Sequence, residues 1–229
     1  KFELKKLMHR PRTFLSIGLM LVLVGLIFWG LKSEGENAMT YVFQSLGDNF
    51  LMQGKILNGY MVCFLILNTL WIHIPVLIVI VTADLFCSEL ETGTIRLLMT
   101  RPISRNRVAL AKFFTAVLYV FFFILIFTSL SLGLALFLFG SDDLIVAFNG
   151  LQIIPEEDLL WRFFAAFGYA VLAMSTFAIF SVTVSFFTRK SLVAILITLG
   201  VIVISTLLQT LAASLFVGWE FFLITYHFT

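Results

Sequence analysis

Charge is scarce in this sequence, and its scarcity decides the class of protein. Only 12% of the 229 residues are Asp, Glu, Lys or Arg, whereas 61% are hydrophobic. Soluble domains carry about 25% charged residues, so half of the usual charged surface is missing. A water-soluble protein is excluded.

Five stretches contain no charged residue at all, and each is 19 to 29 residues long. A helix needs roughly 20 apolar residues to cross the hydrocarbon core of a membrane, and it satisfies its backbone polar groups internally. The short alternating segments of a membrane β-barrel are not seen. We therefore predict an all-α, polytopic helical membrane protein that forms one transmembrane domain, residues 1–229. Its five readable spans are about 13–31, 58–83, 113–139, 163–187 and 191–211.

The first apolar run follows a basic segment, as the core of a secretory signal does. It is longer than the 7–15 residues of such a core, and no clear small-residue cleavage site follows it. We interpret it as a membrane span.

The distribution of Lys and Arg predicts the orientation. With the N-terminus in the cytoplasm, twelve of the fifteen basic residues lie on the inner side and nine of the thirteen acids on the outer side. Basic residues gather in cytoplasmic loops. We expect segments 1–12, 84–112 and 189–190 to face inward, and segments 32–55 and 140–158 to face outward.

Residues that carry chemistry are also rare. Cys63 lies in the second span and Cys87 on the predicted inner side, so no disulfide is implied. His73 has no converging metal or haem ligands, and the spans hold no Ser-His-Asp set or carboxylate pair. The sequence predicts no catalytic, cofactor-binding or metal-binding residue. The basic inner face suits anionic lipid headgroups and needs no nucleic acid to explain it.

The segments outside the spans have their own patterns. Residues 1–12 mix apolar and basic residues before Pro11, which favours a short interfacial helix over a disordered basic tail. The outer segment 32–55 has apolar clusters typical of an interfacial helix. Residues 212–229 remain apolar but follow the fifth span too closely for an ordinary crossing, so we expect an outer re-entrant or interfacial segment.

Three local signals concern the packing of the spans. Pro75 predicts a kink in the second span. Only 188–191 joins spans four and five, so they are expected to pack as a hairpin. The small-residue spacings Ser129-x-x-x-Gly133 and Ser181-x-x-x-Ser185 favour close helix packing.

The long polar segment on the inner side, residues 84–112, is the most informative part of the chain. Apolar residues alternate there with charges, Gly93 interrupts the pattern and Pro102 ends it. We expect a short amphipathic helix, a glycine break, a second short helix and a turn into the third span. The apolar face of such a helix must be buried, either in the lipid interface or in a groove of a partner protein.

Here the sequence resembles the type-two ABC exporter permeases. The resemblance rests on Glu89-x-x-x-Gly93-Thr94, then Leu97-Leu98, then Arg101-Pro102-Ile103-Ser104-Arg105, with Lys112 opening the next span. In that family this loop is the cytoplasmic coupling helix, between spans two and three, that sits in the nucleotide-binding subunit. The residues that this resemblance assigns to ATPase coupling are Glu89, Gly93, Thr94, Leu97, Leu98, Pro102, Ser104 and Arg105.

The resemblance implies a transport mechanism. Two permease subunits, alike or different, would form a pathway in the inner membrane of a prokaryote, and two copies of an ABC ATPase subunit would bind ATP and Mg²⁺ below them. The chain has no G-x-x-x-x-G-K-[ST] motif, so the ATPase is expected to be a separate polypeptide. Members of the family have six spans, so we expect a sixth beyond residue 229.

Two alternatives remain. The segment 84–112 could lie on lipid alone, or the chain could be a non-transporting membrane anchor that docks a cytosolic partner through that segment. An electron-transfer subunit would need paired histidines on facing spans, and these are absent.

The predicted topology is testable by cysteine labelling from each side of the membrane. A cysteine at Ser104 should react only from the cytoplasmic side, and one at Ser141 only from the outside, because the basic segments stay inside. Labelling of the Ser104 position from the outer side would overturn the topology.

Overall fold

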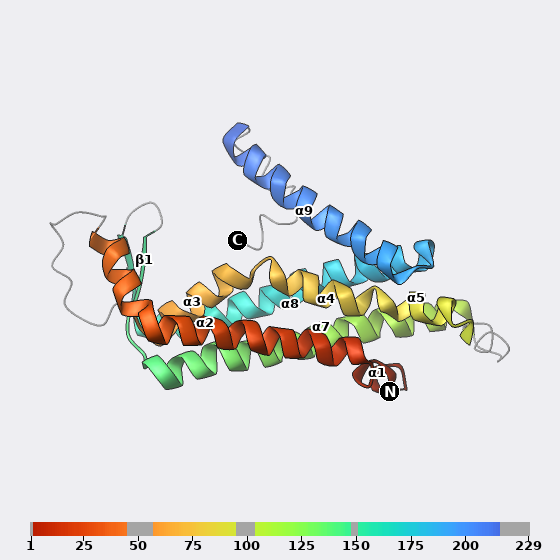
Figure 1. The fold of residues 1–229 in the computed structure, drawn as a ribbon, viewed down its shortest axis with the longest axis horizontal. Coiled ribbons are helices and arrows are strands. Elements are labelled where there is room, and N and C mark those ends of the chain that lie inside the picture. Colours follow the sequence, from red (N-terminus) through yellow and green to blue (C-terminus); the bar gives the residue numbers. More distant parts are fainter. Residues whose placement is uncertain (1, 45–56, 95–103, 148–150, 216–229) are drawn as a thin grey trace. The chain divides into compact units, whose positions relative to one another are not determined.

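The computed structural model describes residues 2–44, 57–94, 104–147 and 151–215 (Figure 1). These residues form helices and one small β-hairpin. The elements are α1 (Phe2–Met8), α2 (Pro11–Gln44), α3 (Gly59–Leu70), α4 (His73–Thr82), α5 (Asp84–Glu91), α7 (Arg105–Phe139), β1 (Leu144–Ala147), β2 (Leu151–Ile154), α8 (Glu156–Thr188) and α9 (Ser191–Leu215).

Five helical stretches are long and apolar enough to cross a membrane, which confirms the predicted class. They are Pro11–Gly35, His73–Glu91, Asn106–Phe139, Glu156–Thr188 and Ser191–Leu208. Large apolar side chains such as Phe14, Trp29 and Phe137 are exposed along them. Exposure of large apolar side chains is expected in a polytopic membrane protein, because a side chain that faces lipid needs no cover from the protein.

The helices run beyond the apolar stretches that predicted them. Helix α2 continues to Gln44, α7 begins at Arg105 rather than near 113, and α8 begins at Glu156 rather than near 163. The sequence-based spans stopped at the first charged residue, whereas a helix that leaves the hydrocarbon core can continue with polar side chains. Part of the predicted outer segment 32–55 is therefore a continuation of α2, and residues 45–56 lie outside the described ranges.

The second span is interrupted one turn before Pro75, where the sequence predicts a kink. Helix α3 ends at Leu70 and α4 begins at His73. Pro75 has no N–H to donate to the carbonyl four residues earlier, that of Trp71, so the helical hydrogen bonding breaks there.

The short amphipathic helix expected at the start of the segment 84–112 is present as α5. Only Ala83, with helical backbone angles, separates α4 from α5, and α5 itself is largely buried. Of the residues between α5 and α7, the structure describes 92–94 and Ser104, and residues 95–103 lie outside the described ranges. Two acids of α5, Asp84 and Glu89, are paired with cations of the same chain.

Two compact units divide the chain, each built from distant segments. The first unit contains residues 1–18, 71–124 and 169–229, and the second contains residues 19–70 and 125–168.

In the first unit, α9 packs against α4 and α5. Ala83, Cys87 and Ala194 form a small core there, joined by Val184 and Ile195. The predicted tight turn after α8 is present, and Arg189 in it has a left-handed φ of 57°. The expected hairpin packing of α8 and α9 stays a prediction, and Val184 of α8 packs against the core that contains Ala194 of α9.

The small-residue spacings have different outcomes. Ser181 and Ser185 are buried, and Ser185 Oγ accepts a hydrogen bond from the backbone N–H of Cys87 at 3.2 Å. Ser129 and Gly133 are exposed in this chain, so spacing alone did not identify a packing face.

The second unit contains a β-hairpin that the sequence reading missed. Strands β1 and β2 pair antiparallel, with Leu144 opposite Ile154 and Ala147 opposite Leu151. The signal was present, since Asn149-Gly150 between two apolar runs is a common hairpin sequence. Asp143, just before β1, accepts a hydrogen bond from the backbone N–H of Glu156 at 2.9 Å and so supports the start of α8.

Helix α3 begins in direct backbone contact with the end of α7. The N–H of Gly59 donates to the carbonyl of Gly140 at 2.8 Å. A Cβ on Gly59 would lie 2.6 Å from that oxygen and 2.8 Å from the carbonyl oxygen of Ala135. Only glycine permits this approach.

Gly59→Ala should therefore destabilise the protein, because two backbone segments would have to separate. Overpacking of this kind costs about 1–3 kcal/mol. The measurement is the melting temperature of the purified protein in detergent. Gly133→Ala is the matched control, since a Cβ there meets nothing within 4 Å. Equal melting temperatures for the two variants would contradict the close contact.

Candidate functional site

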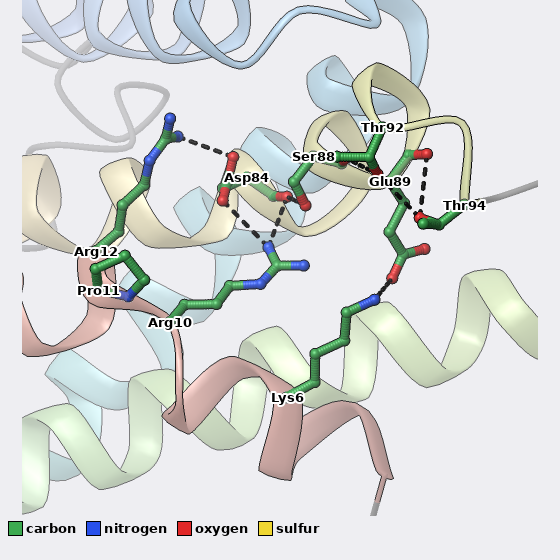
Figure 2. Close-up of a pocket in the computed structure, with 9 residues that line it drawn as sticks. All are labelled: Lys6, Arg10, Pro11, Arg12, Asp84, Ser88, Glu89, Thr92 and Thr94. Carbon is green, nitrogen blue, oxygen red and sulfur yellow. Dashed lines mark hydrogen bonds and ion pairs between the residues drawn. The ribbon is translucent and has the colours of Figure 1, made fainter.

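Helix α1 brings basic side chains to the acidic helix α5. Leu7 anchors α1, since it is 1% exposed and its carbonyl accepts a hydrogen bond from the Thr13 hydroxyl at 2.7 Å. Pro11 starts α2, a position where its missing N–H costs no helical hydrogen bond. In this arrangement Lys6 and Arg10 extend toward α5 (Figure 2).

Asp84, at the start of α5, holds two arginines. Its Oδ2 lies 3.2 Å from Nη1 of Arg10, and its Oδ1 lies 2.8 Å from Nη1 of Arg12 (Figure 2). Arg10 Nη1 also donates to the backbone carbonyl of Asp84 at 2.9 Å. The carboxylate is largely buried, so both arginines are needed to balance its loss of water.

Glu89, one of the predicted coupling residues, joins two lysines of its own chain. Its Oε1 accepts from Lys6 Nζ at 2.6 Å, and its Oε2 lies 2.8 Å from Lys112 Nζ. By its place in the motif alone, Glu89 could pair with the ATPase or cap the second helix of its own loop. In the structure the carboxylate is 5% exposed and is held by α1 and α7.

The acid that follows, Glu91, supports the start of α9. Its Oε1 accepts a hydrogen bond from the backbone N–H of Ser191 at 3.0 Å. A carboxylate at a helix N-terminus is favoured by the helix dipole. Arg12 of α2 donates to the Ser191 hydroxyl at 2.5 Å, so the first residue of α9 also contacts α2.

These groups form one charge cluster in the first unit. We use "charge cluster" for its eight members, Glu3, Lys6, Arg10, Arg12, Asp84, Glu89, Glu91 and Lys112.

A shallow pocket of about 290 Å³ opens beside the cluster. Besides its charged walls it is lined by the hydroxyls of Ser88, Thr92 and Thr94 (Figure 2). Ser88 Oγ donates to the carbonyl of Asp84, and Thr92 Oγ1 to that of Ser88. These hydroxyls stabilise the end of α5 by donating to its backbone carbonyls, and the arrangement fixes helix positions.

The structure places part of the predicted coupling set. Gly93 has φ +71°, the left-handed geometry that ends many helices, which confirms the predicted break. Thr94 is exposed, and its hydroxyl donates weakly to the Glu89 carbonyl at 3.4 Å. Ser104 is exposed just before α7, and Arg105 is the first residue of that helix.

Three members of the coupling set, Leu97, Leu98 and Pro102, lie outside the described residues, as does most of the predicted second helix. Residues 216–229 of the predicted outer segment 212–229 also lie outside them, whereas 212–215 belong to α9.

The sequence analysis missed Asp84, Lys6 and Lys112 as parts of the site. A signal was available, because Asp84 and Glu89 sit among Leu85, Phe86 and Leu90. Acids on a helix that also buries large apolar residues need cations close by. Which cations supply the charge depends on tertiary contacts between α1, α5 and α7.

The fold and this site define a multi-pass helical membrane protein whose buried charges join its helices. The chain belongs to the ABC-2 family of transporters, since the profile described as ABC-2 family transporter protein matches residues 1–220. This match confirms the resemblance drawn from residues 89–112. No curated protein and no solved structure matches the chain.

Asp84→Asn should lower the stability of the protein, because two arginines lose the charge that balances them. Hydrogen bonds to charged groups contribute about 1.5–3 kcal/mol, so we expect a loss of that order. Thermal unfolding in detergent measures it. Glu157→Gln, which removes one exposed negative charge from α8, is the matched control and should have little effect. Equal stability of the two variants would show that the Asp84 pairs contribute nothing.

Proposed function

We propose that the chain is the transmembrane permease subunit of an ABC exporter, and that it couples ATP hydrolysis by a partner ATPase to movement of a substrate. Membership of the ABC-2 family supports the transport role. The observation that carries the coupling role is the position of the segment 92–104, between the buried helix α5 and the spanning helix α7.

Movement of that segment would reach the membrane through these two helices. Only Ala83 separates α5 from α4, and α5 packs against α9. Glu89 of α5 is paired with Lys112 of α7. A partner that pulls on the residues after Gly93 therefore acts on several spans at once. A loop that lacked these helix contacts would move without displacing the spans.

The partners follow from this role. Two copies of the ABC ATPase would bind ATP and Mg²⁺, and a second permease subunit would complete the transport pathway. The excess of basic residues in segments 1–12 and 84–112 supports a cytoplasmic N-terminus and an ATPase on the same side. We assign the protein to the inner membrane of a prokaryote.

The second candidate is a membrane anchor that docks a cytosolic partner through the same segment and transports nothing. A Walker-A ATPase encoded by a neighbouring gene favours the transporter, since such permeases work with a separate ATPase. ATP turnover that depends on the assembled complex discriminates the two further.

Leu97→Asp with Leu98→Asp should release the ATPase or uncouple its ATP turnover from transport. We expect these leucines to be buried against the ATPase, where each contributes about 1.5–3 kcal/mol if fully covered. The change lies between spans, so insertion into the membrane should persist. Co-purification with the tagged ATPase and ATP turnover in proteoliposomes measure the effect.

The matched control is Leu97→Met with Leu98→Met, which keeps the apolar surface and should behave like the natural chain. If the double aspartate variant still co-purifies with the ATPase and shows normal coupled turnover, the coupling assignment is wrong.

A further inference from the structure

The side chain of Lys112 is a charged group with no exposure to solvent, eight residues into α7. Burying an ammonium group is costly unless its protons all find acceptors. Lys112 Nζ donates to the carbonyl of Leu85 at 2.7 Å and lies 2.8 Å from Glu89 Oε2 and 3.6 Å from Glu3 Oε2. The ring of Phe86 lies 5.0 Å from the same nitrogen.

These acceptors belong to two other helices, α5 and α1, and they lie in different directions from the Lys112 nitrogen. Leu85 and Glu89 lie on successive turns of α5, so one ammonium group fixes both the distance and the rotation of that helix relative to α7. Glu3 comes from α1. The second oxygen of Glu89 binds Lys6, which ties α1 to the same point.

The position of this pair along the chain matters as much as its geometry. Glu89 lies in the last turn of α5, which ends at Glu91, and Gly93 with its left-handed φ follows two residues later. The direction in which the chain continues from Gly93 therefore depends on how α5 is held. Apolar packing alone lets a short helix slide or rotate more freely than directional bonds to one buried cation do.

We propose that Lys112 is a positioning residue, which fixes α5 against α7 and α1 so that the segment after Gly93 is presented in one orientation and its displacement reaches α7. The effect on coupling rests on the proposed function, whereas the effect on the position of α5 does not. Lys112 touches no substrate in this account and acts through α5.

A purely structural role for Lys112 makes a different prediction. If the pair only stabilises the fold, replacing both buried charges with apolar side chains of similar length should restore a normal protein, as replacement of buried ion pairs often does. If the pair positions α5, the same replacement restores stability but not the fixed orientation. Lys112→Met alone and Lys112→Met with Glu89→Met separate the two roles.

The distance between α5 and α7 is the direct readout. Spin labels on cysteines at the exposed positions Thr92 and Leu110 report it in the full chain, purified and placed in lipid nanodiscs. Cys63 and Cys87 are buried, and the chain without added cysteines controls for their labelling. The natural chain should give one narrow distance distribution.

The double methionine variant should keep the melting temperature of the natural chain and give a broader or shifted distance distribution. Lys112→Arg, which keeps the charge, should stay closer to the natural distribution than Lys112→Met. A narrow, unshifted distribution in the double variant would overturn the proposal, even if Lys112→Met alone proved too unstable to purify.

A second readout concerns the complex with the ATPase. We expect the double variant to retain the bound ATPase and to lose the dependence of ATP turnover on the permease. If the natural chain binds no ATPase, the proposed function fails while the distance measurement still decides the role of Lys112. If the natural complex is coupled and the double variant is equally coupled, the positioning role is overturned.

Discussion

The buried ion pair between Lys112 and Glu89 is the contact on which the arrangement of α1, α5 and α7 depends. A fully buried ammonium group requires acceptors within hydrogen-bond distance, and α5 supplies two of them. That requirement keeps α5 within the helix bundle. It also brings α1 into place, because Lys6 takes the remaining oxygen of Glu89. We expect α5 to lose its fixed direction when this pair is removed.

The other charges of the cluster extend the same principle to further helices. Asp84 ties Arg10 and Arg12 to the start of α5, and Glu91 supports the first turn of α9. Apolar faces in a membrane protein gain little from contact with one another rather than with lipid, so polar contacts and close packing carry more of the specificity. In the described part of the chain, this cluster determines which helices contact one another, which the pattern of hydrophobic residues alone does not predict.

The span pattern and the local breaks were predictable because they depend on local sequence. Long charge-free runs predicted five spans, Pro75 predicted the break in the second span, and Gly93 predicted the end of α5. Each follows from the chemistry of a single residue or a single run. The family resemblance was predictable for the same reason, since its motif lies within residues 89–112.

The remaining features depend on contacts between distant residues. Glu89 and Lys112 are 23 residues apart, and nothing local indicates that they meet. The short amphipathic helix at the start of 84–112 was predictable, but the burial of its acids was not, because a neutralised acid and a solvated acid look alike in sequence. The β-hairpin at 144–154 was missed for a different reason, since its turn signal was overlooked beside the acidic residues around it.

We propose that the segment after Gly93 contacts an ATPase. Thr94 is exposed and begins that segment, so a photo-crosslinking amino acid at this position reports its neighbour in intact cells. The same amino acid at Ser33, which is predicted to lie on the outer side, is the control. The account predicts a crosslinked product between the Thr94 position and a Walker-A ATPase, and none from Ser33. Crosslinking of the Thr94 position only to lipid, or to a protein without an ATP-binding motif, would contradict it.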